Sequence, residues 1–486
     1  MASIPQANYA VALLSYAQKN PDRVAIAGRT ARVSYGALAR LVLSYVLHLH
    51  VRGVTARSIV AIQGKSGVDS FCLALAANAL GAPWIHIMHP IPSGQVQPTH
   101  QFLIPAYQGE TREGFVSVDH SWASAPRGLP QAAAPTLNGF PGPAAPAVIA
   151  TTSGTTGTPK LVLRSAAQVY QLMRRRPVDE FPGVATTFPM TMLFGFRIAV
   201  ATLLAGRTLI EPDRFADMRA EGADAVFASP AQIEALLAKS PMPDRRMAVL
   251  HVGGAAVTPA QISHWLTYFD SVEIAYGSRE AGDSGHMVVN RGEVPTDIRY
   301  TLHKDVQVEV VDDAETPVAP GETGHVRLKT PVMALGYYND AEGSARAFRQ
   351  GWFYPGDEGF FDPEGRLVIA GRNNDVVNIK GVKINLGFID GFVRGMPGVA
   401  AVAAYFRPGS TGSGKLGVYV VPTDRDSSDA ALKVMALRIR DVLERALGAS
   451  LVPTDIDFVD GLALNDAGKT VRAPDLALKR LGAGRY

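Results

Sequence analysis

The sequence has one cysteine, Cys72, among its 486 residues. An internal disulfide is therefore excluded, and a reducing compartment is expected. No window approaches the ~20 consecutive apolar residues that a membrane-spanning helix needs. Residues 1–20 also have no basic head before their apolar stretch, which argues against a signal peptide. We therefore expect a cytoplasmic protein without a membrane partner.

An excess of charge of either sign is also lacking. The chain has 47 Lys+Arg against 44 Asp+Glu, a formal net charge of +3, and the charges are spread without blocks. This balance gives no reason to expect a nucleic-acid partner. No repeat at a solenoid period is present. With 47% hydrophobic residues, the chain can fill ordinary cores over two or three folding units.

Helical and strand patterns alternate along the first part of the chain. Residues 35–50 have apolar side chains at helical spacing, residues 58–64 read as a buried strand, and residues 70–87 as helix, glycine stop and strand. Residues 224–240 and 247–269 are each predicted to be a strand, a loop and a helix. This rhythm is typical of an α/β fold with parallel-rich sheets.

The pattern changes near Asp305. Strands separated by turn signals predict a small barrel-like β unit that includes residues 306–313, 324–330 and 366–372. After Arg372 a small α+β unit is predicted, with a long helix over residues 430–447. We predict two domains, a core of residues 1–372 and a C-terminal domain of residues 373–486.

The stretch "TTSGTTGTPK", Thr151 to Lys160, follows a short apolar strand. Its composition alone favours a linker. It is not a Walker phosphate loop, because Pro159 stands where the second glycine is required. A strand followed by a Gly/Ser/Thr loop nevertheless allows backbone N–H groups and hydroxyls to converge on an anion. From these residues alone, linker and phosphate loop both stay open.

Two further stretches mimic functional motifs. "ALNDAGKT", Ala463 to Thr470, fits a loose Walker pattern, but Pro474 interrupts the helix that such a loop opens, so a surface turn is the better interpretation. "HIMH", His86 to His89, has the composition of a metal pair. Because no cysteine or acidic cluster lies nearby, these are interpreted as loop histidines.

Four weaker motifs follow in order: "AYGSREAG" at Ala275, "YPGDEG" at Tyr354, "IKGVKIN" at Ile379 and "NDAGKTVR" at Asn465. Together with the loop at Thr151, they resemble the acyl-adenylate-forming (AMP-binding) superfamily over nearly the whole chain. That superfamily contains acyl- and aryl-CoA synthetases, stand-alone adenylation domains, fatty acyl-AMP ligases and beetle luciferases.

The resemblance implies that "TTSGTTGTPK" is a phosphate loop for ATP. Lys160 then provides a point charge for phosphate, and Glu280 holds Mg²⁺, a hard cation that prefers oxygen ligands. Tyr276 and Gly277 lie at the adenine, with Gly253, Gly254 and Ala255 on its other side. Hydroxyls and backbone N–H groups that contact the phosphates are implied at Thr152, Ser153, Gly154, Thr155, Thr156 and Gly157.

The resemblance also assigns residues to ribose binding and catalysis. Asp357 accepts hydrogen bonds from the ribose hydroxyls, Arg372 closes that edge, and Lys469 is the catalytic lysine. Asn374 occupies the hinge about which a C-terminal domain rotates between the two half-reactions. The face used for thiol transfer is implied at Lys380, Gly381 and Lys383.

Two departures from the family pattern concern the acid. Arg279 stands where the family has threonine. A cation there either stabilises phosphate or points away from it, and Arg279 is included among the catalytic residues on the first interpretation. Leu193 stands where amino-acid-activating domains have an aspartate, so an α-amino acid is not expected. We predict an apolar acyl pocket with some polar contacts, formed by Met192, Leu193, Phe194, Arg197, Ala275, Asp283 and Ser284. For Arg197, a polar contact with the acid and a surface-directed side chain both stay open.

The sequence thus predicts an ATP- and Mg²⁺-dependent ligase for an aryl or other non-amino acid. It would form acyl-AMP, release pyrophosphate and transfer the acyl group to a thiol of CoA or of a separate carrier protein. Two alternatives stay open: a ligase that loads a carrier protein only, and a nucleotide-binding pseudoenzyme suggested by Arg279 and Asn374.

Overall fold

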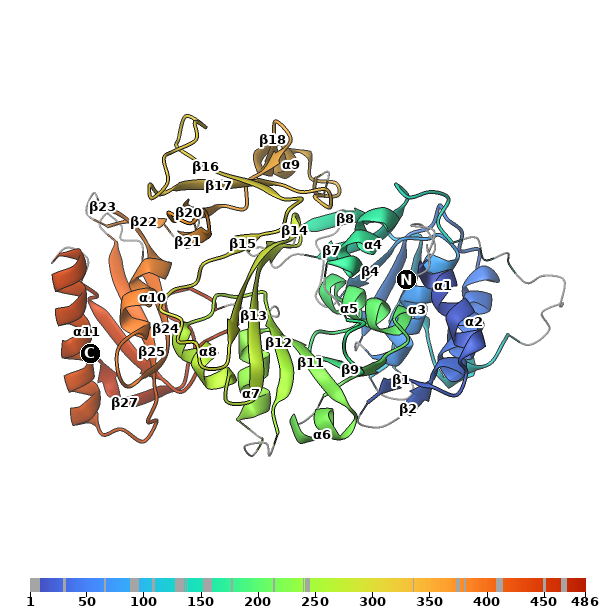
Figure 1. Ribbon diagram of the computed structural model, residues 1–486, viewed down its shortest axis with the longest axis horizontal. Helices are drawn as coiled ribbons and strands as arrows, with labels where there is room; N and C mark the ends of the chain where they lie inside the picture. The colour runs from blue at the N-terminus through green and yellow to red at the C-terminus, as the bar shows by residue number, and fades with distance from the viewer. Residues whose placement is uncertain are drawn as a thin grey trace. The chain divides into compact units, whose positions relative to one another are not determined.

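The computed structural model has two compact units and is drawn in Figure 1. Among the residues that it describes, no helix is long and apolar enough to cross a membrane. The described residues are 9–28, 32–64, 67–87, 96–106, 110–126, 135, 137, 139–151, 160–175, 178–212, 215–238, 240, 245–334, 336–372, 376–379, 382–407, 414–448, 452–464 and 470–486.

The first unit comprises Met1–Gln307 and Leu328–Phe353, and the second comprises Val308–Arg327 and Tyr354–Tyr486. This division places the predicted β unit largely with the C-terminal residues. The predicted hinge at Asn374 lies outside the described residues, so the domain boundary at residues 372 and 373 stays a prediction.

A nine-stranded sheet forms one half of the first unit, in the order β15-β14-β13-β12-β11-β9-β10-β1-β2. The pairs from β13 to β1 are parallel, and β14 is added antiparallel at the β13 edge. The strands are β1 (Val24–Ala27), β2 (Arg32–Ser34), β9 (Gly183–Thr186), β10 (Thr208–Ile210), β11 (Ala223–Ala228), β12 (Met247–Val252), β13 (Phe269–Ser278), β14 (Gly282–Asn290) and β15 (Thr301–Leu302).

A six-stranded sheet, in the order β6-β5-β3-β4-β7-β8, forms the other half of the first unit. Its pairs are parallel except for β7 with β8. The strands are β3 (Val60–Gly64), β4 (Trp84–Ile87), β5 (His100–Ile104), β6 (Val116–Ser117), β7 (Pro146–Thr151) and β8 (Leu161–Ser165).

Helices separate most of these strands along the chain, as the alternating pattern predicts. Helix α2 coincides with the predicted residues 35–50, and Ser34 caps it by accepting a hydrogen bond from the Ala37 backbone N–H. Besides the short β18 (Phe348–Arg349) and β19 (Trp352–Phe353), the unit has α1 (Tyr9–Lys19), α2 (Tyr35–His50), α3 (Val68–Ala79), η1 (His120–Ala123), α4 (Ala166–Arg174), α5 (Leu193–Leu204), α6 (Phe215–Ala220), α7 (Pro230–Leu237), α8 (Pro259–Trp265) and α9 (Ala341–Ala347).

The second unit has the antiparallel strands and the small α+β region that the sequence predicts. Its C-terminal sheet has the order β24-β25-β26-β27, against which α10 and α11 bury apolar side chains. The elements that lie in it or pass into it are β16 (Gln307–Val311), β17 (Gly324–Lys329), β20 (Asp357–Phe361), β21 (Leu367–Arg372), β22 (Val376–Ile379), β23 (Val382–Asn385), α10 (Leu386–Arg394), β24 (Val399–Arg407), β25 (Lys415–Pro422), α11 (Asp429–Leu447), β26 (Asp455–Val459) and β27 (Arg480–Arg485).

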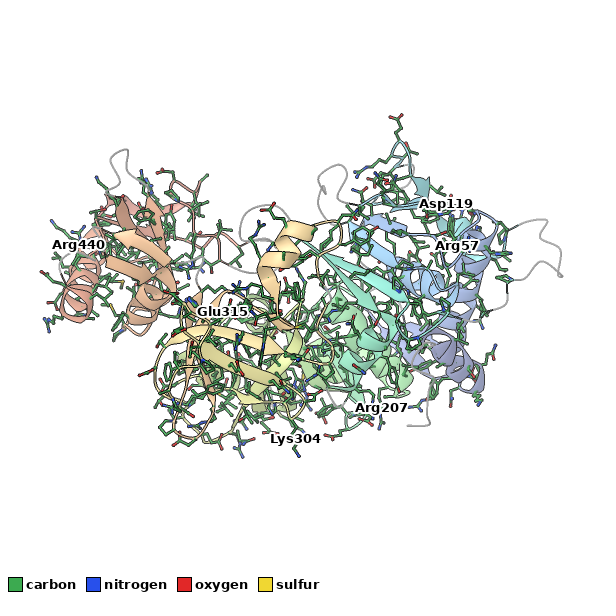
Figure 2. All side chains as sticks on the ribbon, turned by 90° about the horizontal axis from the view of Figure 1, so that it is seen from above. Arg57, Asp119, Arg207, Lys304, Glu315 and Arg440 are labelled. Carbon is green, nitrogen blue, oxygen red and sulfur yellow. The ribbon has the colours of Figure 1, made fainter. Side chains whose placement is uncertain are left out.

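The charged side chains follow the even distribution expected from the sequence. Those labelled in Figure 2, among them Arg57, Asp119 and Lys304, lie on different parts of the chain. Cys72 is fully buried in α3, and burial raises the pKa of its thiol. A buried thiol with a raised pKa is a poor nucleophile.

Candidate active site

The predicted phosphate loop connects β7 to β8. Thr151 at the end of β7 pairs antiparallel with Leu161 at the start of β8, so both ends of the loop are held by the six-stranded sheet. The loop residues themselves, Thr152, Ser153, Gly154, Thr155, Thr156 and Gly157, lie outside the described residues, and their contacts with phosphate stay predictions.

The turn between β13 and β14 carries Arg279 and Glu280. Its backbone is fixed from within, because the Ser278 hydroxyl accepts hydrogen bonds from the N–H groups of Glu280, at 3.2 Å, and Ala281, at 3.0 Å. Gly277 is required here, since a Cβ atom would lie 2.3 Å from the Gly282 carbonyl oxygen. The short turn therefore gives Arg279 and Glu280 defined positions at the end of the sheet.

Arg164 fixes the same turn from β8. Its side chain is fully buried, and Nη2 donates to the carbonyl oxygens of Arg279 and, at 2.8 Å, of Glu280. The Glu280 carbonyl also accepts from the Ala334 N–H at 2.8 Å. Burial lowers the pKa of Arg164 to about 9, against the attraction of the Glu280 carboxylate, so the guanidinium is charged near neutral pH.

The Glu280 carboxylate accepts a hydrogen bond from the Tyr337 hydroxyl at 3.1 Å. The ammonium nitrogen of Lys160 lies 4.5 Å from the centre of the same Tyr337 ring, within the range of a cation–π contact. Burial, followed by the Glu280 charge, raises the pKa of Tyr337, so its hydroxyl stays a donor. Tyr337 thus links the residue that closes the predicted phosphate loop to the predicted metal ligand.

The donor set at Glu280 fits Mg²⁺ bound together with a nucleotide. Among the described residues, no group of three or more His, Cys, Asp or Glu side chains is placed to hold a metal ion. Mg²⁺ commonly takes one or two carboxylates and completes its shell with water and substrate phosphate oxygens. A single carboxylate beside a phosphate loop meets that requirement.

A small pocket opens beside this turn. Its volume of about 20 Å³ is enough for roughly one water molecule, so an organic acid requires the side chains to move. Arg279, Met192 and Leu193 line it, as does Thr151 at the entry to the predicted phosphate loop. The remaining lining residues are Trp84, His86, Val148, Ile149, Ala150 and Thr191.

The interpretation of His86 as a loop histidine is wrong. It lies on β4 and is buried. Nε2 is 3.0 Å from the Gly64 carbonyl oxygen and Nδ1 is 2.8 Å from the Thr191 hydroxyl, which requires a proton on Nε2. Desolvation lowers the pKa of His86, so the ring is neutral. The signal that was available is its position at the carboxyl end of a parallel strand, where ligands of α/β sheets bind.

The other predicted acyl-pocket residues divide into an apolar and a polar group. Phe194 packs on Phe188 with ring centres 4.7 Å apart. Arg197 is buried and not surface-directed, with Nη1 donating to the Leu172 carbonyl oxygen at 2.9 Å. Its Nη2 is 3.8 Å from an Asp283 carboxylate oxygen. Arg197 therefore has protein partners, while Met192 and Leu193 are the predicted acyl residues that face the pocket.

Asp283 continues the polar group. Its Oδ1 atom is 3.6 Å from Nε2 of His303, and the His303 ring lies 5.1 Å from that of His286. The Ser284 hydroxyl is fully buried and has no hydrogen-bond partner among the described residues. Direct contacts of Asp283 and Ser284 with an acid stay predictions.

The residues predicted at the adenine lie on neighbouring strands. Tyr276 is buried and its ring lies 5.3 Å from that of Tyr300. A Cβ atom on Gly253 would lie 3.5 Å from Cβ of Ala275, so the segment of Gly253, Gly254 and Ala255 passes beside the strand that carries Tyr276. Gly254 has φ +92°, a conformation that strongly favours glycine.

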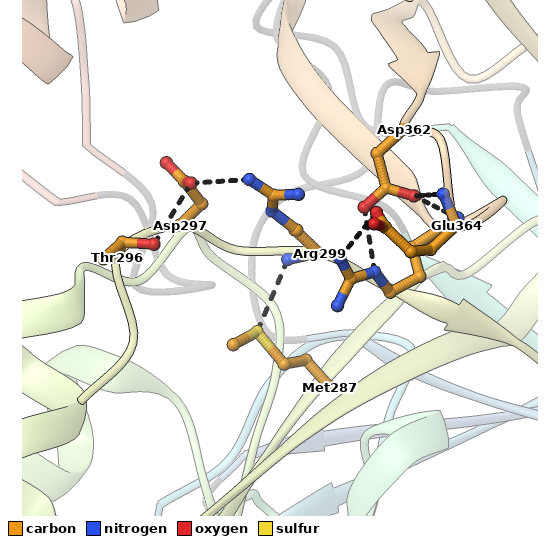
Figure 3. Close-up of polar contacts among 7 residues, drawn as sticks. Met287, Thr296, Asp297, Arg299, Asp362 and Glu364 are labelled. Carbon is orange, nitrogen blue, oxygen red and sulfur yellow. Dashed lines mark hydrogen bonds and ion pairs between the residues drawn. The ribbon is translucent and has the colours of Figure 1, made fainter. Parts of the chain in front are cut away.

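In the second unit, Asp357 and Arg372 are directly paired. They face each other in the antiparallel register of β20 and β21, and Arg372 Nε is 3.1 Å from Asp357 Oδ1. Asp362 closes the hairpin by accepting from the Arg366 backbone N–H at 2.7 Å and from Arg366 Nε at 2.8 Å (Figure 3). The structure thus brings together the two residues predicted to bind ribose.

The remaining predicted residues are mostly outside the described part of the chain. They are Asn374, Lys380, Gly381 and Lys469. Lys383 lies on β23, but its side chain is not described. The described flanks of Lys469 form an isolated antiparallel bridge between Leu464 and Thr470.

Parallel-rich α/β sheets with a turn such as Arg279–Glu280 at a sheet end are typical of enzymes that bind a small molecule at the ends of their strands. The chain belongs to the AMP-binding enzyme family, which matches residues 13–338. The predicted family and fold class are therefore confirmed.

Relatives and solved structures show the same likeness. The chain is 30% identical over 66% of its length to a salicylyl-CoA synthase / salicylate adenylyltransferase of Streptomyces sp, of which it spans 61%. It is 24% identical over 95% of its length to indoleacetate–CoA ligase of Aromatoleum aromaticum, covering 96% of that protein. The fold matches ATP-bound MatB of Rhodopseudomonas palustris with a TM-score of 0.78, at 22% identity and covering 96% and 97% of the two chains.

Arg164 and Tyr337 were missed in the sequence. Arg164 has a visible signal, because a cation in the apolar strand "LVLRS" is expensive to bury and needs a reason. Tyr337 has none, because it lies far from Glu280 in the chain and only the fold brings its hydroxyl to that carboxylate.

Proposed function

We propose that the chain activates a carboxylic acid with ATP and then transfers the acyl group to a thiol. In the first step a carboxylate oxygen forms a bond to the α-phosphorus, the bond between the α-phosphorus and its bridging oxygen breaks, and pyrophosphate leaves. In the second step a thiolate sulfur bonds to the acyl carbon and AMP leaves. The proposal rests chiefly on the contacts that join Lys160, Tyr337 and Glu280 beside the predicted phosphate loop.

The charged residues in and beside the turn each have a separate role in this proposal. Glu280 binds Mg²⁺, which when present neutralises phosphate charge and orients pyrophosphate as the leaving group. Lys160 adds a fixed positive charge at the exit of the loop. Arg164 prevents the turn from moving, so the charges are in place before the reaction begins. Such preorganised charge stabilises the transition state without the cost of reorientation.

Residues of the second unit complete the proposal. Asp357 and Arg372 bind the ribose, and Lys469 stabilises the negative charge that develops at the α-phosphate. Lys380, Gly381 and Lys383 then serve the thiol-transfer step after rotation about Asn374. Removing Lys469 should abolish acyl-AMP formation, because its ammonium group stabilises the transition state, in which negative charge develops on the α-phosphate, more than the ground state.

We propose an aryl or other non-amino acid as the substrate. The pocket wall formed by Trp84, Met192 and Leu193 is apolar, and no described carboxylate lines the pocket to bind an α-ammonium group. Two relatives, named for salicylate and indoleacetate, act on aromatic acids. Because those relatives are named as a CoA synthase and a CoA ligase, CoA is the favoured thiol, with a carrier protein as the alternative acceptor.

The test is acid-dependent exchange of labelled pyrophosphate into ATP. The panel consists of benzoate, salicylate, cinnamate, indole-3-acetate, a hydroxy acid and short to medium fatty acids. Exchange with at least one acid, lost in Lys469→Ala, is expected. No exchange with any acid, together with measurable ATP binding, would instead favour the pseudoenzyme. Incubating the active acid and ATP with CoA or a phosphopantetheinylated carrier protein, and weighing the product, identifies the acceptor.

A further inference from the structure

Arg279 differs from the buried arginines around it, because it is only half-buried and lines the pocket. Arg164 donates to two carbonyl oxygens, and Arg197 has a carbonyl oxygen and a carboxylate as partners. The guanidinium of Arg279 has no hydrogen bond or ion pair within the described part of the chain. Its neighbour Glu280 directs its carboxylate to Tyr337. Arg279 is thus a half-buried cation at the pocket wall. The neighbouring Glu280 charge acts on it, but no described protein group bonds to it, so an anionic ligand can pair with it.

The pocket at Arg279 is lined by both polar and apolar residues. Thr151 leads directly into the predicted phosphate loop, whereas Trp84, Met192 and Leu193 provide apolar surface. Of the lining residues, Arg279 is the one with a permanent charge, because burial lowers the pKa of His86 and keeps its ring neutral. This arrangement suits a ligand with a carboxylate at one end and an uncharged body.

The chemistry of guanidinium favours this occupant. Its planar fork matches a carboxylate through two parallel hydrogen bonds, and such charge-assisted bonds strengthen when water is excluded. The pocket as observed is too small for an acid, but Met192 is an unbranched and adaptable side chain that can make room.

We propose that Arg279 binds the reacting carboxylate of the acid, in a contact that does not require bound nucleotide. The inference rests on the proposed function in that the bound carboxylate is the one that reacts with ATP. The binding itself does not require turnover. Arg279 is then a specificity-determining residue: it selects an anionic carboxylate with an uncharged body and holds it next to the phosphate loop.

The experiment compares Arg279→Thr, Arg279→Gln and Arg279→Lys with the wild type in pyrophosphate exchange. We expect the KM for the acid to rise about 10- to 100-fold in the Thr and Gln variants, the loss of one charge-assisted contact. The KM for ATP should change less than about 3-fold in these variants. The Arg279→Lys variant should keep part of the affinity for the acid. The matched control is Arg346→Thr, since Arg346 is an exposed arginine of α9 paired with Glu342.

Calorimetry of the nucleotide-free protein gives a readout without turnover. Benzoate should bind to the wild type and to Arg346→Thr, benzamide should not, and Arg279→Thr should lose benzoate binding. Equal benzoate affinity in wild type and Arg279→Thr, or a raised KM for ATP with an unchanged KM for the acid, overturns the inference. Benzoate binding through Arg279 without exchange for any acid would support the inference and refute the proposed function.

Discussion

Two arginines at the turn between β13 and β14 of the first unit have different kinds of partner from two arginines of the second unit. In the second unit Arg372 pairs with Asp357 at 3.1 Å, and Arg472 pairs with the buried Asp390 at 2.6 Å. In the first unit Arg164 donates to carbonyl oxygens, and Arg279 has no partner among the described residues. A guanidinium paired with a carboxylate is already neutralised by the fold, whereas an unpaired one that lines a pocket, as Arg279 does, marks a place where an anionic ligand is expected.

The largest effect should come from the first unit. Glu280→Gln keeps the size of the side chain but removes the charge that we propose for Mg²⁺, so kcat/KM for pyrophosphate exchange should fall about 100- to 1000-fold, as for loss of other preorganised charged contacts. Exchange assayed over a range of Mg²⁺ concentrations measures this. Glu293→Gln, an exposed acid just beyond the same hairpin, should keep wild-type rates. An active Glu280→Gln with unchanged Mg²⁺ dependence would remove Glu280 from the metal site.

The next effect concerns stability in the second unit. Arg472→Met leaves Asp390, which is 1% exposed, buried without its main partner, and should lower the free energy of unfolding by about 3 kcal/mol. Arg445→Met removes an exposed pair with Asp441 and should cost less than about 1 kcal/mol. Urea unfolding of both variants measures the contrast. Equal losses in the free energy of unfolding would show that the buried Arg472–Asp390 pair contributes no more to stability than the exposed Arg445–Asp441 pair.

A smaller effect should follow from weakening the Asp357–Arg372 pair. Asp357→Asn keeps a hydrogen-bond acceptor but removes the charge, so the KM for ATP should rise about 10-fold while the KM for the acid is unchanged. Asp362→Asn is the matched control, because Asp362 closes the same hairpin and pairs with Arg366 (Figure 3). It should lower stability without changing either KM. A raised KM for ATP in both variants would assign the effect to the hairpin and not to ribose binding.

The smallest effect is a pH dependence at His86. Because burial lowers the pKa of His86, the unfolded state binds its proton first as the pH falls below about 6.5. Stability contributed by the neutral ring is therefore present above pH 6.5 and is lost on acidification toward the lower folded pKa. The wild type should lose about 1 kcal/mol more than His86→Gln between pH 7 and 5.5. Parallel stability curves from urea titrations at each pH would contradict a neutral buried His86.

The alternation of helices and strands was predictable because each element is indicated by the pattern of its own residues. Residues 35–50 and the strand ending at Thr151 have periodic apolar side chains and clear stop signals, and both elements form as expected. The pairing of Asp357 with Arg372 also follows once the hairpin of β20 and β21 is recognised. These features depend on contacts between residues that are close in the chain.

Other features of the site depend on tertiary contacts, which cannot be predicted from local patterns in the sequence. Whether Arg279 points toward phosphate or away from it was open in the sequence, and only the fold places it beside Met192 and Leu193. Arg197 resembled a possible surface residue until the packing of α5 buried it. The hydrogen bond from Tyr337 to Glu280 joins residues 57 positions apart, and no local pattern indicates it.

The central claim is that Arg279, in contrast to the arginines paired with carboxylates of the protein, binds the carboxylate of the acid substrate. Phenylglyoxal modification followed by peptide mass spectrometry tests it directly in the wild-type protein, with and without benzoate. We predict that benzoate slows modification of Arg279 several-fold and leaves the rate at Arg372 unchanged. Modification of Arg279 at the same rate with and without saturating benzoate, or equal protection of Arg372, would contradict the claim.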